Sequence, residues 1–323
     1  MRVEQGSGEA VVRATRALSR DVRLFEIEPV DGAAAWAPGA HIDVTVRLGE
    51  RTEVRSYSLV GDWHAQRYRI AVKRRPEGRG GSSYMWSLEA GARLTVGAPN
   101  NHFELALDSP EYLLVAGGIG VTPILGMAGS LAARGARFRV LYAARSRADL
   151  ALAEELAASI GDRLQIFVSE EGMRIDADAA VARLGASGEL YLCGPLRMIE
   201  DFRRAWRAAG RRPGAFRVET FGSGGAFAPE PFRVRVVGLA GEVVVPSDRS
   251  MLDALEAAGV EIVADCRRGE FGLCAVDVID VAGRLDHRDV FLSEGQRREG
   301  RKICACVSRA SGEITIDVGW RAD

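Results

Sequence analysis

The sequence Asp265-Cys266-Arg267-Arg268-Gly269-Glu270-Phe271-Gly272-Leu273-Cys274 decides how the last third of this chain folds. It holds two of the five cysteines among the 323 residues, and two more, Cys304 and Cys306, follow further along. Four cysteines grouped at one end of a chain do not resemble a disulfide framework. Thiols grouped in this way indicate a metal site.

The spacing of the two loop cysteines nearly matches a plant-type iron–sulfur loop. In that loop two cysteines separated by four residues are followed, after two more, by a third. Cys266 and Cys274 stand at the outer positions, and Phe271 stands where the middle thiolate belongs. The loop therefore indicates an iron–sulfur site that lacks one expected ligand.

Composition and charge exclude several other classes of protein. The chain is 47% hydrophobic and 27% charged, and its length predicts two or three domains. A net charge of −1 gives no electrostatic preference for nucleic acid or an anionic membrane. No apolar run approaches the roughly 20 residues of a membrane span, and the N-terminal residues lack an apolar signal core. We therefore expect a soluble cytoplasmic protein that binds neither nucleic acid nor membrane.

The sequence before the cysteine loop changes character twice. Up to about residue 105, short alternating runs separated by Gly and Pro predict an antiparallel barrel, as in 22–27, 41–46 and 67–73. From Pro110 onward, strands and helices alternate, which predicts a parallel sheet covered by helices. The expected strands are 112–116, 138–144, 164–168 and 190–193, and the expected helices end at Gly135, span 150–160, and run from Pro195 to Gly210.

A Gly/Pro-rich linker within residues 222–231 separates this region from a smaller module. There the sequence predicts a hairpin of strands 232–237 and 243–245, and a helix over 251–258 capped by Ser250. The expected domains are a β-barrel (1–106), an α/β domain (107–223), a linker (224–231) and an α+β module (232–323).

Two segments of the barrel carry residues suited to a phosphate-bearing ring. In Arg55-Ser56-Tyr57-Ser58-Leu59, side chains alternate between the two faces of a strand and offer a cation, an aromatic ring and two hydroxyls. Gly80-Gly81-Ser82 precede a short helical stretch at Tyr84, and backbone N–H groups at such a position bind phosphate. For the first segment the alternative is an ordinary polar strand, and for the second it is a flexible surface loop.

Two further segments lie at the carboxyl edge of the predicted parallel sheet. The loop Gly117-Gly118-Ile119-Gly120-Val121-Thr122-Pro123 follows an apolar strand, where an open α/β sheet binds a dinucleotide pyrophosphate, although it is not a G-x-G-x-x-G fingerprint. Cys193-Gly194-Pro195 ends another strand at the same edge, with a thiol that either faces the ligand or is buried as a small apolar side chain.

Taken together, these segments resemble the ferredoxin–NADP reductase superfamily, and the module with the cysteine loop and Cys306-Val307-Ser308-Arg309-Ala310 is similar to a plant-type ferredoxin of the β-grasp fold. The order of the three domains resembles the phthalate dioxygenase reductase family over essentially the whole chain. The resemblance implies FMN, NADH and a [2Fe–2S] cluster. It also implies that electrons pass to a terminal oxygenase, of the Rieske non-haem iron class. The alternative is a stand-alone NAD(P)H-dependent flavin or acceptor reductase with a degenerate ferredoxin domain.

The resemblance also implies roles for individual residues. The flavin would be held by Arg55, Ser56, Tyr57, Ser58, Val72 and Lys73, with its phosphate at Gly80, Gly81 and Ser82. The nicotinamide nucleotide would be held by Gly118, Gly120, Thr122, Cys193 and, at the adenosine ribose, Arg145. Hydride transfer would involve Ser58, Cys193, Glu219 and Phe221. Arg145 and Arg147 together suit a 2′-phosphate, whereas the family habit favours NADH.

The cysteines depart from the family pattern at one position. Cys266, Cys274 and Cys306 match three ligands, and Phe271 replaces the fourth. Three outcomes are open: Cys304 substitutes, the cluster is labile or absent, or Phe271 is an engineered change or an error in the sequence. On a strand, residues 304 and 306 face one side roughly 6.5–7 Å apart, so that an adjusted loop would let Cys304 reach the iron left short. The strong alternative is that Cys304 is a buried strand thiol.

Overall fold

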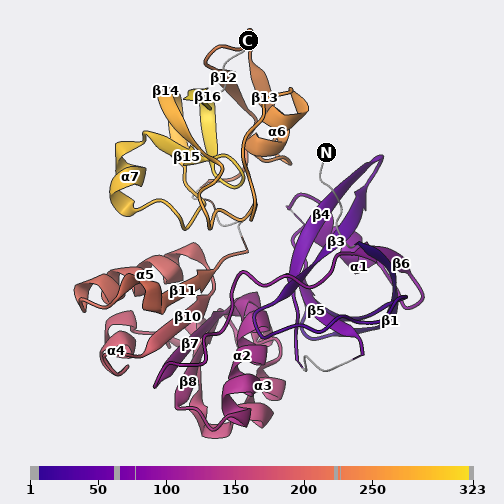
Figure 1. The fold of residues 1–323 in the computed structure, drawn as a ribbon, viewed down its shortest axis with the longest axis vertical. Coiled ribbons are helices and arrows are strands. Elements are labelled where there is room, and N and C mark those ends of the chain that lie inside the picture. The colour runs from indigo at the N-terminus through magenta and orange to yellow at the C-terminus, as the bar shows by residue number, and fades with distance from the viewer. Residues whose placement is uncertain (1–6, 62–65, 77, 222–224, 226, 320–323) are drawn as a thin grey trace. The chain divides into compact units, whose positions relative to one another are not determined.

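The computed structural model describes residues 7–61, 66–76, 78–221, 225 and 227–319 (Figure 1). Contacts divide the chain into two compact units, Met1–Glu219 and Thr220–Asp323. Part of the predicted linker, residues 224 and 226, lies outside the described residues. In the described ranges, no helix is both long enough and apolar enough to cross a membrane.

The first unit begins with an antiparallel sheet in the order β4-β3-β6-β1-β2-β5. A bridge between Leu59 and Ile70 joins its two edges, so the sheet closes into the predicted barrel. Apolar side chains that alternate along the strands, such as Phe25, Ile27 and Ile42, fill the interior. The elements are β1 (Gly8–Ala17), β2 (Val22–Pro29), β3 (His41–Leu48), β4 (Arg51–Ser58), β5 (Tyr68–Lys73), α1 (Gly81–Ser87) and β6 (Arg93–Val96).

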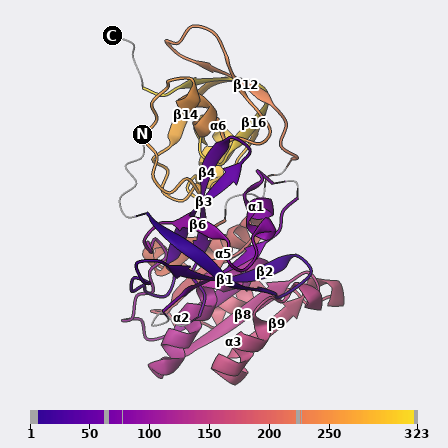
Figure 2. The same ribbon diagram turned by 90° about the vertical axis from the view of Figure 1, so that its right-hand side faces the viewer.

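A parallel sheet in the order β11-β10-β7-β8-β9 completes the first unit. Helices α2 and α3 cover one face and α4 and α5 the other (Figures 1 and 2), so β7 and β10 are buried throughout. The strands are β7 (Tyr112–Gly117), β8 (Phe138–Ala144), β9 (Leu164–Val168), β10 (Glu189–Cys193) and β11 (Phe216–Glu219). The α-helices are α2 (Val121–Ala133), α3 (Ala153–Ile160), α4 (Ala177–Ala182) and α5 (Leu196–Ala208). The 3₁₀ turns are η1 (Gly118–Gly120), η2 (Arg147–Asp149), η3 (Gly161–Arg163), η4 (Ser169–Glu171) and η5 (Pro213–Ala215).

Two details of this sheet differ from the sequence expectation. The helix expected from residue 150 begins only at Ala153, because Leu152 has a positive φ of 60° that breaks helical continuity. The short helix α4 was not expected. It is capped by Asp176, whose side chain accepts a hydrogen bond from the backbone N–H of Ala179 at 3.0 Å.

The second unit is a mixed sheet in the order β13-β12-β16-β14-β15, with one helix packed against it. Strands β12 and β13 pair antiparallel, which confirms the expected hairpin, while β12 and β16 run parallel. Ser250 caps α6 through a reciprocal capping box with Asp253. The elements are β12 (Phe232–Val236), β13 (Val243–Val245), α6 (Met251–Ala257), β14 (Ala275–Asp286), α7 (Glu294–Glu299), β15 (Lys302–Cys304) and β16 (Arg309–Asp317).

Candidate functional site

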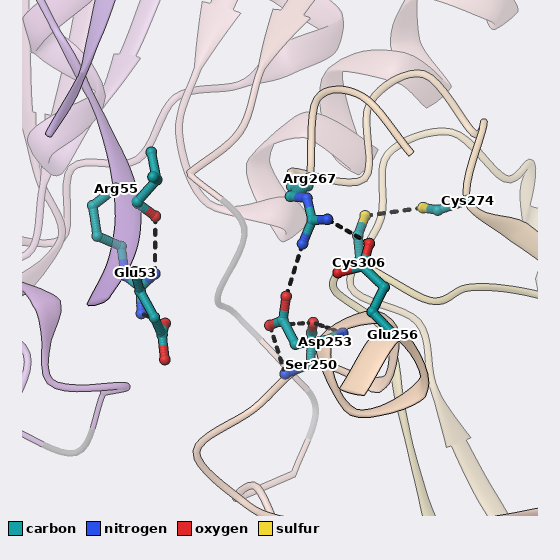
Figure 3. A network of polar contacts seen from close by, with 9 residues as sticks. Glu53, Arg55, Ser250, Asp253, Glu256, Arg267, Cys274 and Cys306 are labelled. Carbon is teal, nitrogen blue, oxygen red and sulfur yellow. Dashed lines mark hydrogen bonds and ion pairs between the residues drawn. The ribbon is translucent and has the colours of Figure 1, made fainter. Parts of the chain in front are cut away.

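Strand β4 and the start of α1 meet at Arg55, on the barrel. A Cβ atom on Gly81 would fall 2.7 Å from Arg55 Nε, so the absence of a side chain there lets the arginine lie directly against this turn. The guanidinium also donates hydrogen bonds to Glu53 (Figure 3) and, at 3.5 Å, to the carbonyl of Arg79. No side chain caps the first turn of α1. A cation beside a glycine turn fits a phosphate-bearing flavin, and Arg55 and Gly81 lie together here. Ser82 Oγ accepts a hydrogen bond from the backbone N–H of Arg75 at 3.0 Å, and its contact with a phosphate stays a prediction.

The other residues expected around the flavin have mixed surroundings. Burial raises the pKa of Tyr57 above its ordinary value. Ser56 Oγ donates a hydrogen bond to Asp43. Lys73 pairs with Asp21 at 3.0 Å, and the carbonyl of Val72 accepts a hydrogen bond from the indole N–H of Trp86. Val72 and Lys73 are thus anchored within the barrel, and their contact with a flavin stays a prediction.

The end of β4 meets the carboxyl edge of the parallel sheet. Ser58 Oγ donates a hydrogen bond to Glu219 Oε2 at 3.5 Å, and both residues are buried. Glu219 ends β11 directly beside Cys193, which ends β10. A Cβ atom on Gly120 would lie 2.1 Å from the carbonyl oxygen of Cys193. Four residues that are far apart in sequence therefore form one chain of neighbours, in the order Ser58, Glu219, Cys193 and Gly120.

The remaining residues of the expected nicotinamide site have structural roles that shape the loop. Gly118 adopts a positive φ of 55°, and Thr122 Oγ1 donates a hydrogen bond to the carbonyl of Ile119 at 2.9 Å. These features turn the chain directly from β7 into α2. Phe221 follows β11 and is half-buried, and its approach to a flavin stays a prediction.

Two ion pairs stand where the adenosine ribose is expected. Arg145, after β8, pairs with Glu170 at 3.0 Å, and Arg147 pairs with Glu171 at 2.7 Å. Strands β8 and β9 are parallel neighbours, so the residues that follow them share one edge of the sheet. Neither glutamate was predicted from the sequence, although their place directly after strand 164–168 was a usable signal.

The cysteine loop is fixed to α6 by an arginine in a strained conformation. Arg267 has a positive φ of 48°, and its guanidinium pairs with Asp253 at 2.8 Å and with Glu256 (Figure 3). The loop also needs Gly269 and Gly272, because added Cβ atoms would lie 2.5 Å from Val307 and 2.3 Å from the ring of Phe291. The folded module therefore holds the loop in one shape.

Three of the four clustered thiols lie together inside this module. The sulfurs of Cys274 and Cys306 are 3.0 Å apart (Figure 3), and Cys274 also hydrogen-bonds to Cys304. The hydrogen bonds with Cys304 and Cys306 lower the pKa of Cys274 far below its usual value, although burial opposes them. Cys266 is only half-buried, and its sulfur accepts a hydrogen bond from the backbone N–H of Glu270 at 3.4 Å.

The donor set does not fit a cluster held by four thiolates. The middle position of the loop is occupied by Phe271, and no group of three or more His, Cys, Asp or Glu among the described residues is arranged to hold a metal ion. The expectation that residues 304 and 306 share one strand is wrong, because β15 ends at Cys304 and the chain turns there. The N–H of Ser308 closes that turn on the carbonyl of Cys304 at 3.0 Å.

Comparison with known proteins identifies the three regions. A family described as oxidoreductase FAD-binding domain matches residues 9–105, oxidoreductase NAD-binding domain matches 114–204, and 2Fe-2S iron-sulfur cluster binding domain matches 234–311. These matches identify flavin-binding, NAD-binding and ferredoxin-type domains, in agreement with the cofactors that the resemblance implied.

Relatives match over nearly the whole chain. Phenoxybenzoate dioxygenase subunit beta of Ectopseudomonas oleovorans is 38% identical and aligns over 92% of this chain and 93% of its own length. Phthalate dioxygenase reductase of Burkholderia cepacia is 32% identical over 98% of each chain. A solved structure of phthalate dioxygenase reductase superposes with a TM-score of 0.77 at 30% identity, over 97% of this chain and 98% of that one. This chain therefore belongs to the phthalate dioxygenase reductase family, the reductase subunits of multicomponent oxygenases, and is an NAD(P)H-dependent flavin oxidoreductase.

Proposed function

We propose that this chain takes hydride from NADH onto FMN and delivers electrons to a separate terminal oxygenase of the Rieske non-haem iron class. The observation that carries this proposal is the contact between Ser58 and Glu219 beside Cys193, because it joins the end of the flavin strand to the edge that binds nicotinamide. The names of the two relatives, both from dioxygenase systems, support the choice of partner. None of the five cysteines, all of which lie in the described ranges, is in a disulfide, which suits a reducing cytoplasm.

The protein's own contribution is to hold and orient its ligands. A bound flavin supplies the chemistry of accepting a hydride and releasing electrons singly. Arg55 and the turn at Gly80–Ser82 would hold its phosphate, and we infer FMN from the order of the three domains, which is that of the phthalate dioxygenase reductase family. Ser58 and Glu219 form a buried hydrogen-bonded pair that would orient the reacting edge of the flavin. Cys193, which is also buried, would shield that edge of the flavin from solvent.

Two ion pairs at the carboxyl edge of the parallel sheet favour NADH over NADPH. Arg145 and Arg147 are 83% and 68% exposed, yet each already pairs with a glutamate. A 2′-phosphate would have to break these pairs and would lie beside two carboxylates, whereas a 2′-hydroxyl can donate a hydrogen bond to one of them. We propose that Glu170 and Glu171 set the preference for NADH.

The double variant Glu170→Gln/Glu171→Gln is expected to use NADPH better, because both arginines would then be available to a phosphate. We expect kcat/KM for NADPH to rise by roughly tenfold, the equivalent of one charge-assisted hydrogen bond. Steady-state reduction of ferricyanide with each nucleotide measures this change. The double variant Asp108→Asn/Asp162→Asn removes the same charge ahead of β7 and β9, at the opposite edge, and should change nothing. Equal effects of the two double variants would contradict a local role.

The proposed function is tested with the purified full-length chain. We expect the protein to bind FMN, NADH to bleach the visible flavin band without oxygen, and a purified Rieske-type terminal oxygenase to be reduced in turn. A protein that stays colourless after incubation with FMN would refute the flavin assignment. Flavin bleaching without reduction of the oxygenase would refute the partner alone.

Phe271 favours a second candidate, a stand-alone flavin or acceptor reductase with a degenerate ferredoxin domain. In that case ferricyanide, which accepts electrons at the flavin, would be reduced rapidly by NADH. A terminal oxygenase and cytochrome c would be reduced slowly. The ratio of these rates separates the two candidates.

A further inference from the structure

The ligand positions of the cysteine loop divide into a buried half and an exposed half. Cys274 and Cys306 are buried, and their sulfurs lie 3.0 Å apart, close enough to share one metal ion. Cys266 is half-buried, and Phe271 is 39% exposed. Because a [2Fe–2S] cluster has two protein ligands on each iron, the missing ligand belongs to the exposed half, beside Cys266.

Cys304 lies in the other half. Its side chain is 0% exposed and lies in the hydrophobic core of the module, where it hydrogen-bonds to Cys274. Two backbone interactions fix the position of Cys304. Cys304 pairs with Ala275 across β14 and β15, and the N–H of the next residue, Ala305, donates a hydrogen bond to the carbonyl of Cys274 at 3.0 Å. To reach the exposed half, Cys304 would have to leave the core and break this ladder.

The nearest carboxylate in the loop is also engaged elsewhere. Glu270, next to Phe271, accepts a hydrogen bond from the backbone N–H of Thr220 at 2.9 Å, while its own N–H is directed at the sulfur of Cys266. Glu270 therefore uses one carboxylate oxygen to hold the loop to the backbone of Thr220.

We propose that neither Cys304 nor Glu270 replaces the missing ligand, so that the module supplies three thiolates and one open position at residue 271. The inference rests on the assignment of residues 234–311 to a 2Fe-2S domain. Cys304 is a side chain of the hydrophobic core, and the absence of the fourth thiolate makes iron binding weaker than the fold alone would allow. Because Phe271 is exposed, a cysteine placed there can complete the set without disturbing the core.

The test compares full-length protein purified without oxygen in five forms: the unmodified chain, Phe271→Cys, Phe271→Ala, Cys304→Ala, and Phe271→Cys with Cys304→Ala. Iron and acid-labile sulfide per flavin are measured, together with the rate at which a chelator removes iron. We expect Phe271→Cys to hold about two irons per flavin and to lose them at least tenfold more slowly than the unmodified chain. Phe271→Ala controls for the loss of the ring and should match the unmodified chain.

Removing Cys304 should leave iron content and release rate the same as in the matching parent. If Cys304→Ala lost iron and Phe271→Cys restored it, Cys304 would be the ligand and the proposal would be wrong. Equal iron retention by the unmodified chain and Phe271→Cys would also overturn it. Cys304→Val, which keeps the core filled, repeats the comparison if the alanine variant unfolds. Flavin content and NADH-dependent ferricyanide reduction report on the first unit, so a failure of the proposed reductase function would be seen separately.

Discussion

Replacing Arg55 by alanine is expected to abolish most flavin binding, while the barrel remains folded. The guanidinium lies beside Gly81 and bonds to Glu53 and to the carbonyl of Arg79, which places it at the turn where the phosphate is expected. Hydrogen bonds to a charged group contribute about 2–3 kcal/mol each, which predicts a Kd for FMN raised roughly 30- to 150-fold. Titrating the flavin-free protein with FMN and following the quenching of flavin fluorescence measures this change.

Two further variants test whether the change in Kd is specific to the guanidinium of Arg55. Arg51→Ala removes an exposed arginine from the other end of the same strand and should leave the Kd unchanged. Arg55→Lys keeps the charge but loses the planar guanidinium with its paired N–H donors, so its Kd for FMN should fall between those of the unmodified chain and Arg55→Ala. A normal Kd in Arg55→Ala would show that the phosphate is held elsewhere.

The fold could be predicted from sequence where one physical signal dominated. Strands 138–144 and 164–168 have the predicted bounds because short apolar runs between helical segments have few alternatives in an α/β domain. The late start of α3 could not be predicted, since it depends on the positive φ of Leu152. Helix α4 has six residues, too few for a periodic signal.

The candidate site depends on contacts that no local pattern encodes. Ser58 and Glu219 are 161 positions apart and meet only because the barrel and the parallel sheet pack together. The resemblance to a known family supplied both residues, whereas periodicity supplied neither. The ion pair of Arg145 with Glu170 likewise needed the strand order, which places β9 beside β8. The prediction that Cys304 is a ligand relied on a strand that in fact ends at that residue.

Replacing Gly120 by alanine is expected to stop hydride transfer and leave the flavin bound. The added Cβ would lie 2.1 Å from the carbonyl oxygen of Cys193 and 2.6 Å from its carbonyl carbon, and these backbone atoms cannot yield as a flexible side chain does. Either α2 or the end of β10 must therefore move, and both carry residues proposed to hold nicotinamide. A misplacement of about 1 Å at reacting atoms costs on the order of 100-fold in rate, so flavin reduction by NADH should slow at least that much.

Anaerobic stopped-flow reduction by NADH measures this rate, and FMN content shows whether the barrel is intact. The matched control is Gly129→Ala in α2, where the new Cβ would meet only Ser159 Oγ at an ordinary 3.8 Å. Because alanine is favoured over glycine inside helices by about 1 kcal/mol, this control should be as stable as the unmodified chain or more so, and equally fast. If Gly120→Ala retained FMN and were reduced at the normal rate, the close approach of α2 to Cys193 would serve packing alone. Nicotinamide would then have to bind away from the loop that follows β7.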